Sequence, residues 1–226
     1  METIVLDAIA FEPNMGALLR SLHLESESKH AERVRALAAA AQAVARPKAV
    51  YREAYVEARD EGAVTVDGVR LTSHVLRVNL EQAQRVFPYV ATCGRELEAW
   101  AEGIEDMLER YYADTIMEAA LRTAQRAFEA DLEARYVPGR TSAMNPGSLP
   151  DWPLREQVPL FSLLGAPRQA IGVELTDSYL MLPIKSVSGL RFPTEVRFEN
   201  CQLCPRPQCP GRHAPYDKDL YEKRYH

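Results

Sequence analysis

Apolar residues recur every three or four positions over residues 28–45, where Val34, Leu37 and Ala41 share one side of the pattern. This period predicts an amphipathic helix that packs on a core. Pro47 ends it, because the residue before a proline disfavours helical geometry. Residues 1–13 read instead as a short strand or extended arm, followed by a first helix.

The longest helical pattern covers residues 100–135, with Gly103 as a candidate break. Its predicted apolar side consists of Met107, Leu108, Tyr111, Ile116, Ala119, Ala120, Leu121, Ala124, Phe128 and Leu132. Asp114 and Glu118 are four residues apart and therefore share one face of this helix. They are either solvated surface charges or, if that face borders a cavity, groups that attract a cation.

Strand-like segments stand between these helices. Residues 63–66 and 69–71 flank Asp67-Gly68, which predicts a β-hairpin with a type I′ turn. We expect a short helix over residues 81–86 and a buried strand over residues 87–92. Cys93-Gly94 then leads into a helix that starts near Arg95. Cys93 is either a buried structural thiol or a thiolate favoured by the helix dipole.

A proline-rich loop follows the long helix. Residues 137–153 hold four prolines and two glycines, which excludes a regular helix or a central strand. Long irregular connections of this kind often bind ligands. A helix over residues 154–164 should come next, with Asp151 as its N-cap.

Residues 176–192 change from helix-like to strand-like composition. Pro183 removes a backbone donor, and the Ser-Val-Ser-Gly sequence of residues 186–189 provides hydroxyls and a flexible turn. We interpret the segment as a strand and loop facing a ligand. The alternative is an ordinary strand that ends in a glycine turn.

Composition narrows the classes of function. The 226 residues are 46% hydrophobic and carry a net charge of -5, without a basic stretch that would neutralise phosphates, so nucleic acid is not expected as a partner. No run approaches 18 apolar residues, and the first residues lack the charge pattern of a signal peptide. We expect a cytoplasmic protein with no membrane association and a single α+β domain, in which long helices pack on an antiparallel sheet.

Three cysteines crowd the C-terminal region in a C-x2-C-x4-C arrangement: Cys201, Cys204 and Cys209. Three thiolates could hold a zinc ion, with His213 or Cys93 as the fourth ligand, or an iron–sulfur cluster. The alternative is three reduced cysteines in a disordered tail.

The sequence TDSYLMLPIKSVSG of residues 176–189 resembles a segment of the S-adenosylmethionine-binding reactivation domain of cobalamin-dependent methionine synthase, T-E-S-x-A-M-x-P-x-A-S-V-S-G. ADTIMEAA, residues 113–120, is similar to A-D-R-L-A-E-A-F in the same family. The family pattern R-x-x-P-G-Y-x-x-x-P-D resembles the proline-rich loop. The likeness covers about residues 90–195.

The resemblance implies a set of residues that contact S-adenosylmethionine. They are Glu118, Arg140, Pro146, Gly147, Asp151, Tyr179, Ser186, Val187, Ser188 and Gly189. The chain departs from the family in three respects. Assigning the arginine's role to Arg140 requires a one-residue insertion before the Pro-Asp pair, Ser148 replaces the tyrosine, and the family's N-terminal ligand-binding aspartate has no counterpart.

The resemblance also implies a reaction and its partners. Reductive methylation returns a cobalamin to its methylated form with one electron and the sulfonium methyl group. The chain has neither the Asp-x-His-x-x-Gly of cobalamin carriers nor a flavin or G-x-G-x-x-G motif. The cobalamin should therefore sit on a separate methionine synthase or corrinoid methyltransferase subunit. An electron-donor protein should reduce it, unless the cysteine cluster delivers the electron.

We expect a methyltransferase-type activity that acts on the cobalamin of this partner. Residues 1–80 should form a helical and hairpin part of the same domain, residues 81–199 the S-adenosylmethionine-binding core, and residues 200–226 a cysteine-rich tail. Two alternatives are a metal-stapled module that only senses S-adenosylmethionine, and a redox iron–sulfur protein that relays electrons.

Overall fold

The computed structural model describes residues 2–209 and 211–225, and its central element is strand β6 (Arg85–Thr92). Strands β2 (Lys48–Arg52) and β3 (Ala54–Arg59) follow one another along one edge of β6, and β10 (Ser186–Pro193) pairs with the other edge. All of these pairings are antiparallel. Seven of the eight residues of β6 are buried, so both of its faces are covered.

The remaining strands extend this sheet. They are β1 (Thr3–Leu6), which pairs with β2, the hairpin of β4 (Ala63–Val66) and β5 (Val69–Thr72), which continues from β3, and β7 (Thr141–Met144), which pairs with β10. Strands β8 (Glu174–Leu175) and β9 (Met181–Leu182) form a separate small sheet. Asp67 and Gly68 both have positive φ, at 43° and 77°, which confirms the predicted type I′ hairpin.

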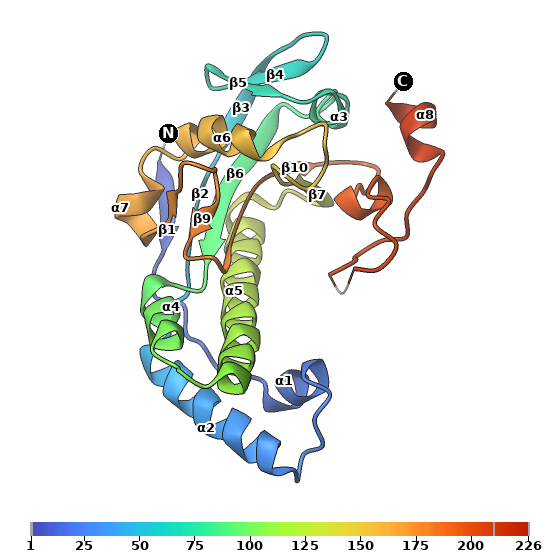
Figure 1. Ribbon diagram of the computed structural model, residues 1–226. Coiled ribbons are helices and arrows are strands. Elements are labelled where there is room, and N and C mark those ends of the chain that lie inside the picture. Colours follow the sequence, from blue (N-terminus) through green and yellow to red (C-terminus); the bar gives the residue numbers. More distant parts are fainter. Residues whose placement is uncertain (1, 210, 226) are drawn as a thin grey trace.

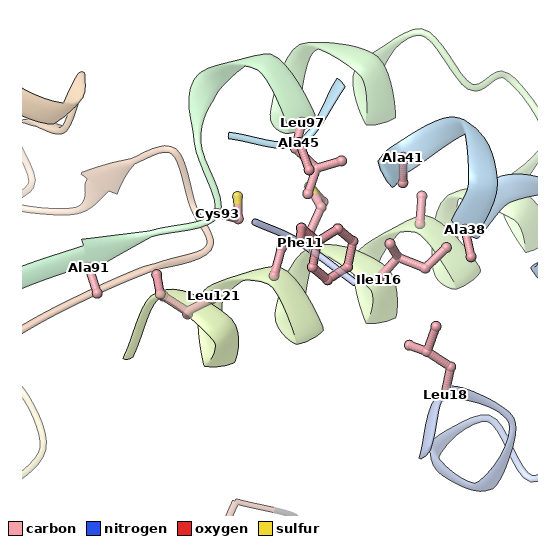
Figure 2. Close-up of a cluster of buried hydrophobic side chains, with 14 of the residues drawn as sticks. Phe11, Leu18, Ala38, Ala41, Ala45, Ala91, Cys93, Leu97, Ile116 and Leu121 are labelled. Carbon is pink, nitrogen blue, oxygen red and sulfur yellow. The ribbon is translucent and has the colours of Figure 1, made fainter. Parts of the chain in front are cut away.

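Helix α5 (Met107–Tyr136) covers one face of the sheet, and three further helices pack on it in the same core: α1 (Met15–Ser21), α2 (Lys29–Val44) and α4 (Arg95–Glu102). Alternate residues of β6, namely Phe87, Tyr89 and Ala91, point into this core. The four helices gather at one end of the molecule and the β4–β5 hairpin lies at the opposite end (Figure 1). Phe11 and Ile116 lie close together among these helices (Figure 2).

The opposite face is covered by short helices and by the C-terminal segment: α3 (His74–Asn79), η1 (Leu154–Glu156), α6 (Gln157–Leu163), α7 (Pro167–Ile171), η2 (Asn200–Gln202) and α8 (Leu220–Arg224). Trp152 is fully buried here. Phe198 and Tyr225 also enter this core, so the C-terminal segment packs on the domain.

Three predictions about local structure were wrong. The helix predicted over residues 81–86 lies earlier in the chain, at α3. The Ser73 hydroxyl accepts a hydrogen bond from the Leu76 amide and so caps the start of a helix there. Residues 85 and 86 belong to β6. Residues 141–144 of the proline-rich loop form β7. Asp151 does not cap the helix after it, since that helix begins at Leu154 without a side-chain cap.

The apolar side predicted for the long helix was also partly wrong. Met107 is 86% exposed, and Leu108 and Tyr111 are exposed as well. The buried face of α5 begins at Tyr112, and a period of about 3.6 residues places these three side chains on the side of the helix away from Ala113, Ile116 and Ala120. The predicted break at Gly103 is confirmed, as α4 ends at Glu102.

Within the part of the chain that the structure describes, no helix combines the length and the apolar character needed to cross a membrane.

Gly189 lies inside β10, so the predicted turn at residues 186–189 was wrong. A Cβ atom at this position would stand 2.5 Å from Asn145 Nδ2, 2.7 Å from the Met144 carbonyl oxygen and 2.9 Å from the Tyr89 hydroxyl. Two side chains and the backbone of β7 therefore approach β10 at a point where only glycine leaves room.

We predict that Gly189→Ala lowers the free energy of unfolding by about 1–3 kcal/mol, because the new methyl group overpacks a site that the Met144 carbonyl and two hydrogen-bonded side chains already fill. Chemical denaturation measures the change. Gly62→Ala is the matched control, since a Cβ there meets nothing within 4 Å. Equal effects of the two substitutions would contradict the packing constraint.

Candidate functional site

Three cavities adjoin one another around β10 and α5. The apolar cavity, of about 390 Å³, is lined by Asn145, Pro146, Ser148, Leu154, Gln157, Leu180, Met181, Ile184, Ser186, Val187 and Ser188. The polar cavity, of about 670 Å³, is lined by residues of β7, β10 and α5, among them Gln125, Glu129 and Arg191. It is also lined by the segment that carries Cys201, Cys204 and Cys209, which we call the cysteine segment. The α5 cavity, of about 410 Å³, holds Asp114, Glu118 and Lys185.

The apolar and polar cavities meet at the edge of β10. Asn145, Ser148 and Val187 line both cavities. Strand β7 pairs with β10 only from Leu190 to Pro193, which leaves the edge from residue 186 to residue 189 without a second strand partner in the described chain. Backbone groups on such an edge are free to bind a ligand that presents its own donors and acceptors.

The proline-rich segment and the Ser-Val-Ser-Gly segment therefore come together, as the sequence predicted. Asn145 makes the connection between them. Its Nδ2 donates to the Ser188 carbonyl at 2.7 Å and to the Tyr89 hydroxyl at 3.0 Å. Asn200 Nδ2 donates to the Asn145 Oδ1 at 3.1 Å, which ties the cysteine segment to the same group. Burial raises the pKa of Tyr89, so its hydroxyl stays protonated.

The two predicted serine hydroxyls donate to groups of the protein itself. Ser186 Oγ lies 2.6 Å from the Pro183 carbonyl and 2.9 Å from Thr92 Oγ1. Ser188 is buried and donates to Gln157 Oε1 at 3.2 Å. These bonds fix the strand beside the cavities. The hydroxyl oxygens can still accept a hydrogen bond, but the backbone is the larger source of free groups at this edge.

Glu118 lies on α5 in the α5 cavity, where it forms an ion pair with Arg122 at 3.2 Å. Its side chain is 40% exposed, so this pair contributes little to stability. Asp114, one turn earlier, pairs with Lys185 at 2.9 Å and so attaches α5 to the segment before β10. Gly211 lines both the α5 cavity and the polar cavity, which makes the two cavities neighbours.

The other predicted ligand contacts lie in different places. Gly147 lines the polar cavity, and its amide donates to the Trp152 carbonyl at 2.7 Å. Arg140 is exposed, lines none of the three cavities, and donates from Nη1 to the Glu195 carbonyl at 2.8 Å. Tyr179 has positive φ and is exposed between β8 and β9. Its role as a ligand contact stays a prediction.

Asp151 also lies outside these cavities and binds the start of α3. One carboxylate oxygen accepts from the Ser73 hydroxyl and from the Val75 amide at 3.0 Å. The other accepts from the His74 amide at 3.3 Å. Its predicted contact with a ligand stays a prediction, while the geometry gives it a structural role.

The cysteine prediction is not supported as a metal centre. Cys201, Cys204, Cys209 and His213 all line the polar cavity, and all three thiols are free. Among residues 2–209 and 211–225, however, no group of three or more His, Cys, Asp or Glu side chains is placed to hold a metal ion. The Arg212 guanidinium donates to the carbonyls of Cys201, Cys204 and Arg206, and this network gives the segment its shape.

Sequence reasoning missed three residues of the site: Asn145, Gln157 and Arg191. A signal existed for two of them. Asn145 precedes a proline and stands where a strand should stop. Arg191 has the same strand parity as Val187, so alternation along β10 predicts that the two side chains share a face. Gln157 carries no such signal.

Comparisons with known proteins identify the family and the fold. The family model of the vitamin B12 dependent methionine synthase activation domain matches residues 89–201. Among solved structures, the crystal structure of the MetH reactivation domain bound to AdoHcy is similar, with a TM-score of 0.62 and 17% sequence identity over 88% of this chain and 81% of that chain. A search of the curated proteins found no match. The structural likeness confirms the predicted α+β fold.

We predict that Asp151→Asn lowers the free energy of unfolding by about 1–2 kcal/mol, because the helix start at α3 loses a negative charge that faces its amides. Thermal melting measures the effect. Asp177→Asn, at an exposed position, is the control and should change stability by less than about 0.5 kcal/mol. A wild-type melting curve for the Asp151 variant would contradict the structural role.

We predict that the Cys93 thiol is inert in the folded protein. Burial and then the charge of Glu98 raise its pKa from 9.0 to about 12, so the reactive thiolate is scarce below that pH. Titration with an aromatic disulfide reagent at pH 8 should label Cys201, Cys204 and Cys209 in the native protein. Cys93 should react only after unfolding, or as the pH nears 12. Labelling of all four thiols at similar rates at pH 8 would show that Cys93 is not buried in this way.

Proposed function

The chain belongs to the family of vitamin B12-dependent methionine synthase activation domains, and from this premise we propose that it binds S-adenosylmethionine in the groove that the apolar and polar cavities form. It then provides the methyl group that reactivates the cobalamin of a separate protein. The MetH reactivation domain, which has a similar fold, was crystallised with AdoHcy, the demethylated form of the same ligand.

The observation that carries this proposal is the unpaired edge of β10 between two cavities of different character. Adenine is a flat base with donors and acceptors along its rim, so it suits a strand edge beside apolar side chains such as Leu154 and Met181. Pro146, Gly147 and Val187 lie at the same place. The cavities also have the size expected of a small-molecule site, roughly 300–1,000 Å³.

Charge supports the same ligand. S-adenosylmethionine carries a sulfonium and an ammonium group, which a carboxylate stabilises, and a carboxylate of its own, which a guanidinium binds. Glu118 is the proposed carboxylate, since it lines the α5 cavity, which neighbours the polar cavity. Ser186 and Ser188 hold the strand edge in place for the base.

The protein itself needs no nucleophile in this reaction. The partner's reduced cobalt attacks the methyl carbon, the carbon–sulfur bond breaks with its electron pair kept by sulfur, and S-adenosylhomocysteine remains. An external electron-donor protein supplies the single electron that reduces the cobalt beforehand. The chain contributes binding and orientation of the sulfonium, so its effect on rate comes from proximity.

We predict that the wild-type protein binds S-adenosylmethionine in calorimetry and that Glu118→Gln weakens this binding by about tenfold, because a charge-assisted contact to a cationic ligand is lost. Glu133→Gln, at an exposed position of the same helix that lines none of the cavities, is the matched control. A wild-type protein without measurable binding would refute the proposed function.

We also predict methyl transfer to added cob(I)alamin, with S-adenosylhomocysteine formed in equal amount to methylcobalamin. Mass spectrometry and the cobalamin absorption spectrum follow the two products. Binding of S-adenosylmethionine without transfer would instead favour a protein that only senses this ligand.

A further inference from the structure

The proposed ligand has a carboxylate, and the arginine that the family resemblance assigns to it is badly placed. Arg140 is exposed, its guanidinium donates to a carbonyl, and it lines none of the three cavities. In the pattern R-x-x-P-G the arginine stands three residues before the Pro-Gly pair. Counted back from Pro146 and Gly147, that position is Ala143.

Arg191 stands beside this position on the neighbouring strand. In the antiparallel register of β7 and β10, Arg191 is the direct partner of Ala143, and both residues line the polar cavity. Side chains of directly opposed residues lie about 5 Å apart at their Cβ atoms. The guanidinium of Arg191 therefore occupies the region that a longer side chain at Ala143 would reach.

The guanidinium is held in one position before any ligand arrives. Nη1 donates to Thr141 Oγ1 at 3.0 Å, and Nη2 forms an ion pair with Glu129 on α5. Its central carbon lies 5.8 Å from the ring centroid of Phe128. The side chain is only 20% exposed. A guanidinium fixed in this way loses little conformational entropy when it binds a carboxylate.

One of its donors is also left without a partner. Arg191 Nε is buried and makes no hydrogen bond to any described residue, although an unpaired buried donor is costly. The Arg191–Glu129 pair places a positive and a negative group side by side on the wall of the cavity. The free Nε–H therefore leaves a charged donor on this wall for a ligand carboxylate.

We propose that Arg191, rather than Arg140, binds the carboxylate of the amino-acid portion of S-adenosylmethionine. The inference rests on the proposed function, because it assigns a residue to the same site. It makes Arg191 the residue that selects ligands with an amino-acid portion over those with only the nucleoside portion.

The test compares two ligands by calorimetry. S-adenosylmethionine has the carboxylate, and 5′-methylthioadenosine has the same nucleoside and sulfur without the amino-acid portion. Arg191→Gln should weaken S-adenosylmethionine binding by about 10- to 100-fold and change 5′-methylthioadenosine binding by less than about twofold. Arg140→Gln is the matched control and should leave both affinities unchanged.

The remaining outcomes separate the two proposals. If the wild-type protein binds S-adenosylmethionine and Arg191→Gln binds it equally well, or loses both ligands to the same extent, the assignment to Arg191 is overturned while the proposed function stands. If the wild-type protein does not bind S-adenosylmethionine, both fail. Should Arg191→Gln not fold, Arg191→Lys replaces it. Lysine keeps the charge but not the planar fork, so a selective loss of about threefold or more for S-adenosylmethionine supports the assignment, and no selective loss overturns it.

Discussion

The double burial of β6 is the constraint on which the rest of the structure depends. Its two edges are paired and its two faces are covered, so each neighbouring strand has a single register that keeps apolar side chains out of water. Pairing with β6 also determines which face of the sheet each side chain of β10 lies on. Val187 and Arg191 point to the side of α5, whereas Ser188, Leu190 and Phe192 point to the opposite core. A slip of one residue would exchange the two sets.

The loop that ends β7 also creates the site. Proline cannot donate to a strand ladder, so pairing with β10 stops once the chain reaches Asn145 and Pro146. The side chain of Asn145 then takes over, because its amide donates to the Ser188 carbonyl where a backbone amide would otherwise do so. No other described strand pairs with the edge beyond this bond, and Ser148 of the same loop lies beside it. The Asn145-Pro146 pair therefore both ends β7 and leaves the edge of β10 open to the groove.

The groove continues along one face of α5. Glu118, Arg122, Gln125 and Glu129 follow at steps of four, three and four residues, which is the spacing of a single helix face. Gln125 is neutral, while Glu118 pairs with Arg122 and Glu129 pairs with Arg191, so the wall presents positive and negative groups at fixed places. Such an arrangement suits a ligand that carries both signs of charge. It also requires little rearrangement when such a ligand binds, so little conformational entropy is lost.

The sequence by itself determined several of the local elements and the family. Periodicity predicted α2 and α5, the Asp-Gly pair predicted the β4–β5 hairpin, and the Ser-Val-Ser-Gly and Pro-Gly segments identified the two parts of the groove. These features depend on neighbours in the chain, which a sequence displays directly. The tertiary structure alone decided that Gly189 lies in a strand, that Asp151 binds α3, and that Arg191 stands opposite Ala143. Each of these depends on a contact between residues far apart in the chain, and strand register and helix packing, rather than local preference, determine which distant groups meet.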